Sequence, residues 1–141
     1  MLRKLIATDD DAATTVLRLV TGIVFFAHGA QKMLGWFGGY GFTGTMGFFT
    51  GMLHIPAVFA FLAIAAEFFG GIGLILGLFT RFFAAAVAIE MLVITVLYWG
   101  NGFGWMKRGY EYVLLWGLVS FAIALRGGGP YSLDRKIGKE L

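Results

Sequence analysis

Residues 56–79 read PAVFAFLAIAAEFFGGIGLILGLF, and this stretch decides the fold. Its one ionisable side chain is the carboxyl group of Glu67, near the middle. A helix needs about 20 mostly apolar residues to cross the roughly 30 Å of hydrocarbon in a bilayer, and this stretch is long enough. We therefore expect it to span a membrane as an α-helix.

Three further apolar stretches, residues 13–34, 82–99 and 110–125, have the same character. None of them alternates apolar and polar residues as a transmembrane β-strand would. The 141-residue chain is 59% hydrophobic and 13% charged, which is too little charge for the surface of a soluble domain. The sequence thus predicts one all-α domain over residues 1–141, a polytopic membrane bundle of four transmembrane helices.

The segment between the first two predicted helices, residues 35–52, is rich in glycine and aromatic residues. Glycine permits tight and left-handed backbone, and aromatic rings favour the headgroup region of a bilayer. We expect a loop followed by a short interfacial or re-entrant helix over about residues 43–52. Residues 77–81 predict instead a tight turn, which makes the second and third helices antiparallel neighbours.

Basic residues predict the orientation of the chain. If the N-terminus is cytoplasmic, eight of the 11 Lys and Arg residues fall on the cytoplasmic side, and only Lys32, Lys107 and Arg108 fall outside. This asymmetry predicts that both termini are cytoplasmic. The net charge of +3 then suits a cytoplasmic membrane face and requires no nucleic acid partner. We expect Arg18 and Arg126 near that face, in contact with anionic lipid.

The composition also limits the possible cofactors. The chain has no cysteine, which excludes disulfide exchange, iron–sulfur clusters and covalently attached haem. No Glu-x-x-His pair indicates a di-iron centre. We predict no metal site and no intrinsic cofactor, although the residue types leave open one zinc or copper ion held by His28, Glu67 and Glu90.

Two glutamates form the centre of the predicted site. Glu67 lies roughly 16 Å from the start of its helix, and Glu90 lies roughly 14 Å from the start of the next. Because these helices are antiparallel neighbours, both carboxyl groups are expected near the middle of the bilayer. A carboxylate at that depth is costly, so it normally faces a partner or an internal cavity.

Two further groups of residues are expected at the outer level of the bundle. His28, Gln31 and Lys32 share one face of the first helix, and three polar and aromatic residues open the fourth. We predict an outward-opening polar pocket in which Glu67, Glu90 and His28 carry the chemistry. Its expected substrate-binding residues are Gln31, Lys32, Tyr110, Glu111 and Tyr112.

Structural interpretations of the same residues stay open. The two glutamates could be neutral acids that hydrogen-bond to backbone or to Thr95. Lys32 could extend to the interface, and the tyrosines could belong to an aromatic belt. His28 could form a hydrogen bond between helices.

In addition, the sequence resembles the DoxX family of small four-helix prokaryotic membrane proteins along nearly its whole length. The order and spacing of short motifs carry the resemblance: Arg18-Leu19, His28-Gly29-Ala30-Gln31-Lys32-Met33, Glu67 with Gly70-Gly71, Gly77-Leu78-Phe79-Thr80-Arg81, Tyr110-Glu111-Tyr112, and Arg126-Gly127-Gly128-Gly129-Pro130-Tyr131-Ser132-Leu133-Asp134.

This resemblance implies a multi-pass protein of the prokaryotic inner (plasma) membrane. Some members of the family are subunits of a quinone-reducing thiosulfate oxidoreductase, and others look like partners of sulfur-handling and oxidative-stress enzymes. The matching positions His28, Lys32, Glu67 and Glu111 agree with the pocket expected from the residues alone.

The sequence therefore favours a membrane subunit of a redox system that binds a quinone or a similar apolar molecule. Whether the chain is itself an enzyme stays open, and its electrons would come from a protein partner or from the substrate. A second hypothesis is a structural or assembly subunit, in a complex or a homo-oligomer. A small proton-coupled transporter is a third.

Overall fold

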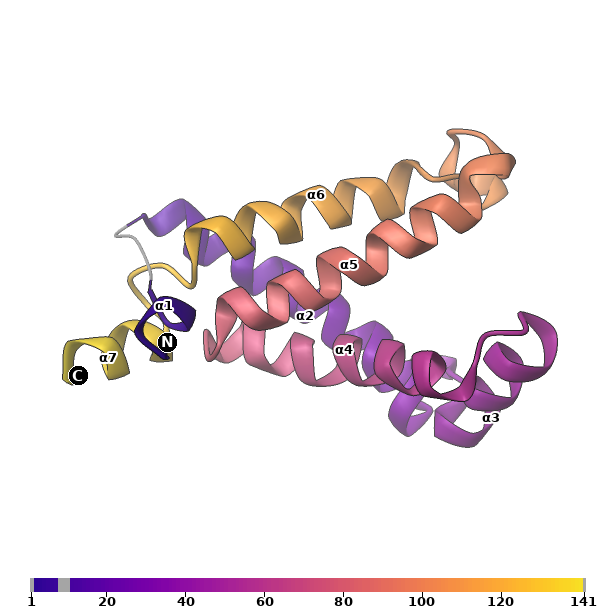
Figure 1. The fold of residues 1–141 in the computed structure, drawn as a ribbon, viewed down its shortest axis with the longest axis horizontal. Helices are drawn as coiled ribbons and strands as arrows, with labels where there is room; N and C mark the ends of the chain where they lie inside the picture. The colour runs from indigo at the N-terminus through magenta and orange to yellow at the C-terminus, as the bar shows by residue number, and fades with distance from the viewer. Residues whose placement is uncertain (1, 8–10, 141) are drawn as a thin grey trace.

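The computed structural model describes residues 2–7 and 11–140 of the chain. Four long helices make up its body (Figure 1): α2 (Ala12–Leu34), α4 (Ala57–Leu76), α5 (Thr80–Tyr98) and α6 (Glu111–Arg126). The shorter segments are α1 (Leu2–Leu5), η1 (Trp36–Gly38), α3 (Gly41–Gly47), η2 (Phe48–Met52), η3 (Trp99–Asn101), η4 (Trp105–Lys107) and α7 (Leu133–Glu140). No strand occurs among the described residues, so the all-α prediction is confirmed.

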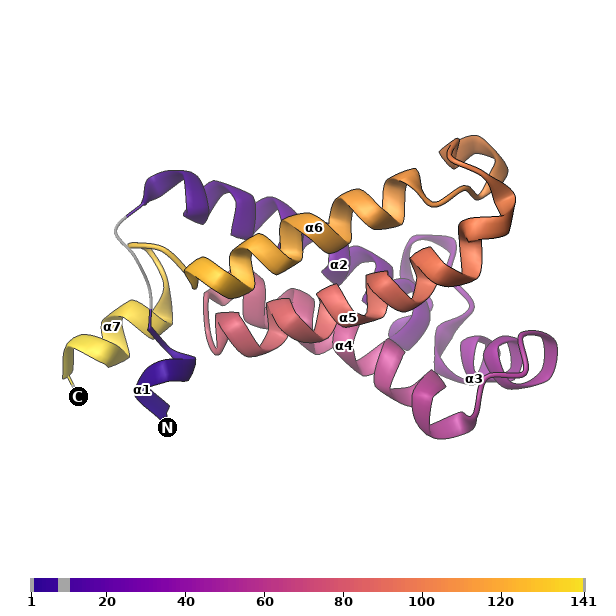
Figure 2. The ribbon, with the colours of Figure 1, turned by 45° about the horizontal axis from the view of Figure 1, so that its top comes forward.

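Three of the helices, α2, α4 and α5, are long and apolar enough to cross a membrane. The fourth, α6, has 16 residues and is shorter than the roughly 20 residues of an ordinary span. It lies alongside α5 in both views (Figures 1 and 2). The chain is thus an all-helical membrane protein with three helices of spanning length in the part that the structure describes.

The turn between α4 and α5 lies where it was expected, but its helix ends differ. The expected helix over residues 56–79 stops at Leu76, because Gly77 takes a left-handed conformation (φ 67°) and its N–H bonds back to carbonyls of the last turn. Phe79 is also left-handed, with φ 48°, and α5 begins directly after it at Thr80.

Glycines bring α2 and α4 into close contact. A Cβ atom on Gly29 of α2 would lie 2.4 Å from the Cα of Phe68, and one on Gly71 of α4 would lie 2.3 Å from the backbone N of Phe26. A Cβ on Gly22 would meet α4 in the same way, 2.7 Å from a backbone nitrogen. Only glycine allows backbones this close, as is common in helix pairs within membranes. The crossing fixes which residues of α2 face α4.

The second pair of helices, α5 and α6, packs against the first through small apolar clusters. Phe25 of α2 meets Val87 and Met91 of α5, and Leu74 of α4 meets Ala84 and Ile123.

We call the end of the bundle near both chain termini the terminal end and the opposite one the loop end. At the loop end the α5–α6 pair diverges from α4 and α3 in both views (Figures 1 and 2).

Arg18 holds the terminal end together, and the lipid contact predicted for it is wrong. Its side chain is 1% exposed. The guanidinium donates to the carbonyls of Leu74 and Ile75 at the end of α4, and to those of Gly128 and Tyr131 in the segment after α6. The last turn of a helix leaves carbonyl groups without partners, and a buried guanidinium needs acceptors for its N–H groups. The Arg18 side chain therefore satisfies these carbonyls and its own donors at once.

Two more side chains complete this end. Asp134 accepts hydrogen bonds from the backbone N–H groups of Phe79 and Thr80, at 2.7 and 2.8 Å, where α5 begins. Arg81 donates to the carbonyls of Ala124 and Leu125 in the last turn of α6. Asp134 thereby joins α7 to the start of α5, and Arg81 joins the start of α5 to the end of α6.

The glycine- and aromatic-rich connection contains helical structure, as expected. Its α-helical part, α3, covers Gly41–Gly47 and begins two residues before the predicted start at 43, while η2 continues with π-helical hydrogen bonding. Gly39 lies against the backbone of Gln31, where a Cβ would come within 2.2 Å of the carbonyl oxygen. The connection therefore folds back onto the loop end of α2.

Candidate functional site

The central feature of the candidate site is an ion pair between Lys32 of α2 and Glu67 of α4. The Lys32 Nζ donates to Glu67 Oε2. The Glu67 side chain is 5% exposed and that of Lys32 is 24% exposed. Gly29 makes the contact possible, because it lets the α2 backbone approach the Glu67–Phe68 backbone directly. Gly29 lies about one helical turn before Lys32, so the close crossing of α2 and α4 at this glycine brings the lysine side chain to Glu67.

Glu90 of α5 is the third member of this cluster. Its carboxyl group lies close enough to Glu67 and Lys32 for its charge to interact with theirs. Its Oε2 atom is buried and has no hydrogen-bond partner among the described residues. The structure therefore brings together Lys32, Glu67 and Glu90 from three different helices. A shared position was expected from their depths for the two glutamates, whereas Lys32 was expected at the outer level of the bundle.

This arrangement contains one ammonium and two carboxyl groups. An ionised carboxylate only accepts hydrogen bonds, so Glu67 and Glu90 can share a hydrogen bond only when one of them carries a proton. The lysine can balance a single negative charge, and the second acid then holds or releases that proton. The cluster is chemically equipped to store one proton inside the membrane helices.

His28 and Gln31 are not brought into the cluster. His28 is exposed on α2, one turn before Lys32. The Gln31 amide instead reaches the backbone oxygen of Phe37 in the loop-end connection, at 3.4 Å. Among the described residues no group of three or more His, Cys, Asp and Glu side chains could hold a metal ion. His28 therefore does not join Glu67 and Glu90 in a ligand set.

The residues at the start of α6 lie in aromatic contacts. Tyr110 stacks on Trp99 with ring centroids 4.5 Å apart and planes 14° from parallel. Tyr112 meets Trp116 edge-on at 6.2 Å. Glu111 is half-buried in the first turn of α6. Of these three predicted substrate-binding residues, the two tyrosines thus take part in aromatic contacts at the loop end, and Glu111 lies between them in the sequence.

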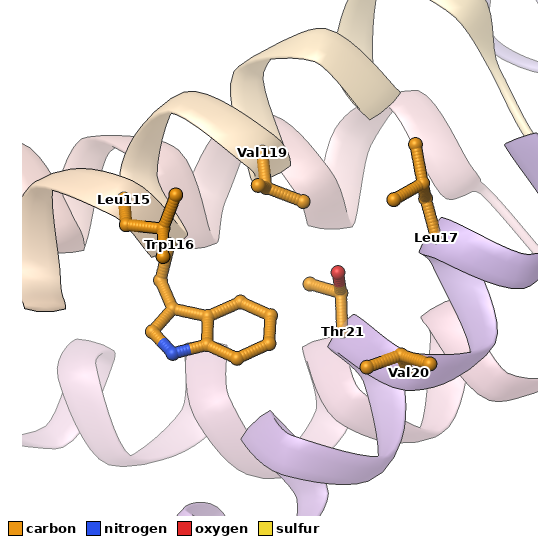
Figure 3. Close-up of a pocket in the computed structure, with 6 residues that line it drawn as sticks. All are labelled: Leu17, Val20, Thr21, Leu115, Trp116 and Val119. Carbon is orange, nitrogen blue, oxygen red and sulfur yellow. The ribbon is translucent and has the colours of Figure 1, made fainter.

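A separate cavity of about 140 Å³ lies between α2 and α6 (Figure 3). Its lining consists of Leu17, Val20, Thr21, Leu115, Trp116 and Val119. We call it the α2–α6 groove. Its residues were not among those predicted, because an apolar run shows no sign of which of its positions face a gap. The one available signal was a threonine at mid-depth in an apolar helix, at position 21.

The fold and the cluster together define a class: a small, all-helical, polytopic membrane protein with an ion pair buried between its helices. The DoxX family model matches residues 13–99, which cover α2 to α5. The chain belongs to the DoxX family, as its motifs indicated.

Curated relatives cover nearly the whole chain. It is similar to "Putative oxidoreductase CatD" of Bacillus subtilis, with 33% identity over 126 residues, 88% of this chain and 86% of the relative. It is also similar to "Inner membrane protein YqjF" of Escherichia coli, with 28% identity over 136 residues, 93% of this chain and 96% of the relative. An uncharacterized protein of Haemophilus influenzae is 33% identical over 132 residues, 88% of this chain and 90% of the relative. No solved structure matches the chain.

Proposed function

We propose that the chain is a membrane subunit of a redox system, in which the Lys32–Glu67–Glu90 cluster exchanges protons with an apolar substrate of the quinone class. The observation that carries the proposal is the cluster itself, three ionisable groups gathered from α2, α4 and α5. Ionisable residues inside membrane helices commonly mark proton relays or substrate pathways. The printed name of the Bacillus subtilis relative, "Putative oxidoreductase CatD", supports a redox role for this chain.

The proposed chemistry is the reduction of a quinone to a quinol, which takes up two electrons and two protons. The chain has no cysteine, and we propose no redox cofactor of its own. A reduced partner enzyme or an oxidisable substrate at the membrane surface would supply the electrons. The role of the cluster is to deliver the two protons one at a time. One acid of the Glu67–Glu90 pair passes its proton on while Lys32 stabilises the carboxylate that remains, and that carboxylate then takes the second proton from water.

The proposed setting is a prokaryotic inner membrane, crossed four times with both termini in the cytoplasm. The terminal end then faces the cytoplasm and carries Arg81 and Arg126, while Lys107 and Arg108 lie at the loop end. In this arrangement α6 is the short fourth span beside α5, and α3 lies in the outer headgroup region. The name of the Escherichia coli relative supports the choice of membrane.

Quinone retention tests the proposal. The protein would be purified in mild detergent as wild type, Glu67→Gln and Glu90→Gln, and its quinone content and affinity for added quinone measured. Glu140→Gln, at the last residue of α7, is the matched control for the change of an acid to an amide. We expect the two cluster variants to lose quinone-linked activity in membranes with the native partners, and Glu67→Gln to lose bound quinone as well. Equal activity in all four proteins would contradict the proposal.

An assembly role is the second candidate, because the Lys32–Glu67 pair also ties α2 to α4 and thereby fixes the helix register. In that case Glu67→Gln would lower the yield of the intact complex without changing the activity per complex. Measuring copurified partner proteins beside activity separates the two candidates.

A further inference from the structure

The two acids of the cluster are covered, whereas their lysine partner reaches the surface. The Glu67 side chain is 5% exposed and that of Lys32 is 24% exposed. The Oε2 atom of Glu90 is buried as well. A substrate that takes a proton from either acid must therefore first find it uncovered, and the Lys32 side chain is a covering group with an exposed edge.

The acids are closed off toward the terminal end and approach the surface toward the loop end. On the terminal side, Leu74 of α4 and Val87 of α5 are both 0% exposed. On the other side, the surface of α2 opens within one turn, because Phe25 is 2% exposed and His28 is exposed. The α5–α6 pair diverges from α4 and α3 at that end (Figures 1 and 2). The way to the acids therefore leads past Lys32.

The Lys32 side chain can move while the helices stay in place. A Cβ on Gly29 would lie 2.4 Å from the Cα of Phe68, so the backbones of α2 and α4 are in direct contact beside the cluster. The lysine, in contrast, has a flexible four-carbon stem. It lies in the last turn of α2. The carbonyl groups of a last turn lack partners within the helix and carry the negative end of the helix dipole, so they offer the ammonium a second resting place.

Charge decides which of these two places the ammonium takes. Glu67 is the one ionisable residue of α4, and α3 and η2 have none. The other titratable groups toward this end are Glu90 of α5, the exposed His28 and the half-buried Glu111 at the start of α6. One carboxylate in the Glu67–Glu90 pair balances the Lys32 ammonium. When both acids are protonated, a partly buried ammonium has no counter-charge beside it, which is strongly unfavourable.

We propose that the Lys32 side chain is a movable cover over the Glu67–Glu90 pair. It stays closed while the pair carries at least one negative charge, and it swings toward the loop end when both acids are protonated. The purpose of this movement rests on the proposed function, because opening lets the substrate reach the pair when both acids have a proton to give. The movement itself needs no quinone and can be measured without it.

NMR of the lysine side chains tests the movement. The chain has five lysines, which are Lys4, Lys32, Lys107, Lys136 and Lys139. Lysine that is isotope-labelled at Cε therefore gives few signals, and Lys32→Arg identifies the signal of Lys32. A water-soluble gadolinium chelate, added to the detergent-purified protein, broadens the signals of those lysines that water reaches. Lys107, which is exposed at the loop end, is the internal reference.

Three variants change the charge of the pair in steps. Glu67→Gln and Glu90→Gln each leave one acid, and the double variant leaves none. We expect the Lys32 signal to stay protected in wild type and in both single variants. In the double variant its broadening should rise severalfold, to that of Lys107. A double variant in which Lys32 stays protected would overturn the proposal. So would a single variant that exposes Lys32 as fully as the double variant, since one remaining carboxylate should hold the cover closed.

A second measurement tests the covering itself and uses single substitutions. Lys32→Met and Lys32→Ala both remove the positive charge, but methionine keeps most of the stem and alanine does not. Dicyclohexylcarbodiimide, an apolar reagent for protonated carboxyl groups, should label Glu67 and Glu90 severalfold faster in Lys32→Ala than in Lys32→Met. Equal rates would show that the stem covers neither acid and would also overturn the proposal. Neither measurement involves quinone, so a failure here leaves the quinone retention test standing by itself.

Discussion

Arg18 and Gly128 are 110 positions apart in the chain, yet the Arg18 Nε donates to the Gly128 carbonyl at 2.8 Å. The same guanidinium serves three other carbonyls, at the end of α4 and in the C-terminal segment. We predict that Arg18→Gln destabilises the protein by about 3 kcal/mol or more, because several buried carbonyls lose their donors at once. Thermal unfolding in detergent measures this.

Arg126→Gln is the control for that experiment. Arg126 pairs with Asp11 at 3.2 Å, but its side chain is 54% exposed. An exposed ion pair is worth about 0–1 kcal/mol, so this variant should unfold close to wild type. Equal losses at positions 18 and 126 would show that burial of the Arg18 guanidinium does not matter for stability.

Gly29→Ala should separate the partners of the ion pair. The added Cβ would lie 2.4 Å from the Phe68 backbone, so α2 and α4 must move apart, and Lys32 then loses its position beside Glu67. We expect a loss of stability of about 2 kcal/mol, typical of overpacking in a close-packed site. Gly47→Ala should be neutral or stabilising, because a Cβ there would meet no described atom within 4 Å. A distance between spin labels on α2 and α4 would report the separation directly.

Substitutions in the cluster should follow a definite order of severity. Lys32→Met leaves two acids without their cation and should cost about 3 kcal/mol. Glu67→Gln should cost about 1 kcal/mol, because Glu90 remains within the range of Lys32. The double variant Lys32→Met with Glu67→Gln should be less damaged than Lys32→Met alone. Unfolding midpoints of all three proteins give the order, and the reverse order would mean that Glu90 does not interact with the lysine.

Asp134→Asn should loosen the start of α5. The carboxylate uses one oxygen for the N–H of Phe79 and the other for the N–H of Thr80, whereas an amide has only one acceptor oxygen. We expect a loss of about 1–2 kcal/mol. Hydrogen exchange should accelerate at the Phe79 and Thr80 amides, while amides in the middle of α5 stay protected. Unchanged exchange at both amides would count against this capping role.

The helices could be predicted from the sequence because each is a long apolar run, and the depth of Glu67 and Glu90 followed from the rise of a helix. Their meeting with Lys32 was also within reach, since antiparallel neighbours bring the middle of one helix to the middle of the next. The helix ends were less accurate, because the left-handed residues at positions 77 and 79 end α4 before its apolar run ends.

The remaining features depend on contacts between distant parts of the chain. His28 and Lys32 share a helical face, but the long lysine stem reaches α4 while the shorter imidazole stays exposed. Arg18 looked like a lipid-facing cation, because its four carbonyl partners lie 56 or more positions away. The α2–α6 groove arises where the side chains of two apolar helices do not fill the space between them. The spacing of apolar residues in the sequence does not predict such a gap.

The contacts of Arg18 also set the order in which the protein can be completed during synthesis. Two of its four carbonyl acceptors, in Gly128 and Tyr131, belong to residues translated more than a hundred codons after it. Until that part of the chain leaves the ribosome, the Arg18 guanidinium lacks two of its hydrogen-bond acceptors. A chain that stops after α6 lacks both of these acceptors and leaves the buried Arg18 guanidinium with only the two carbonyls of α4.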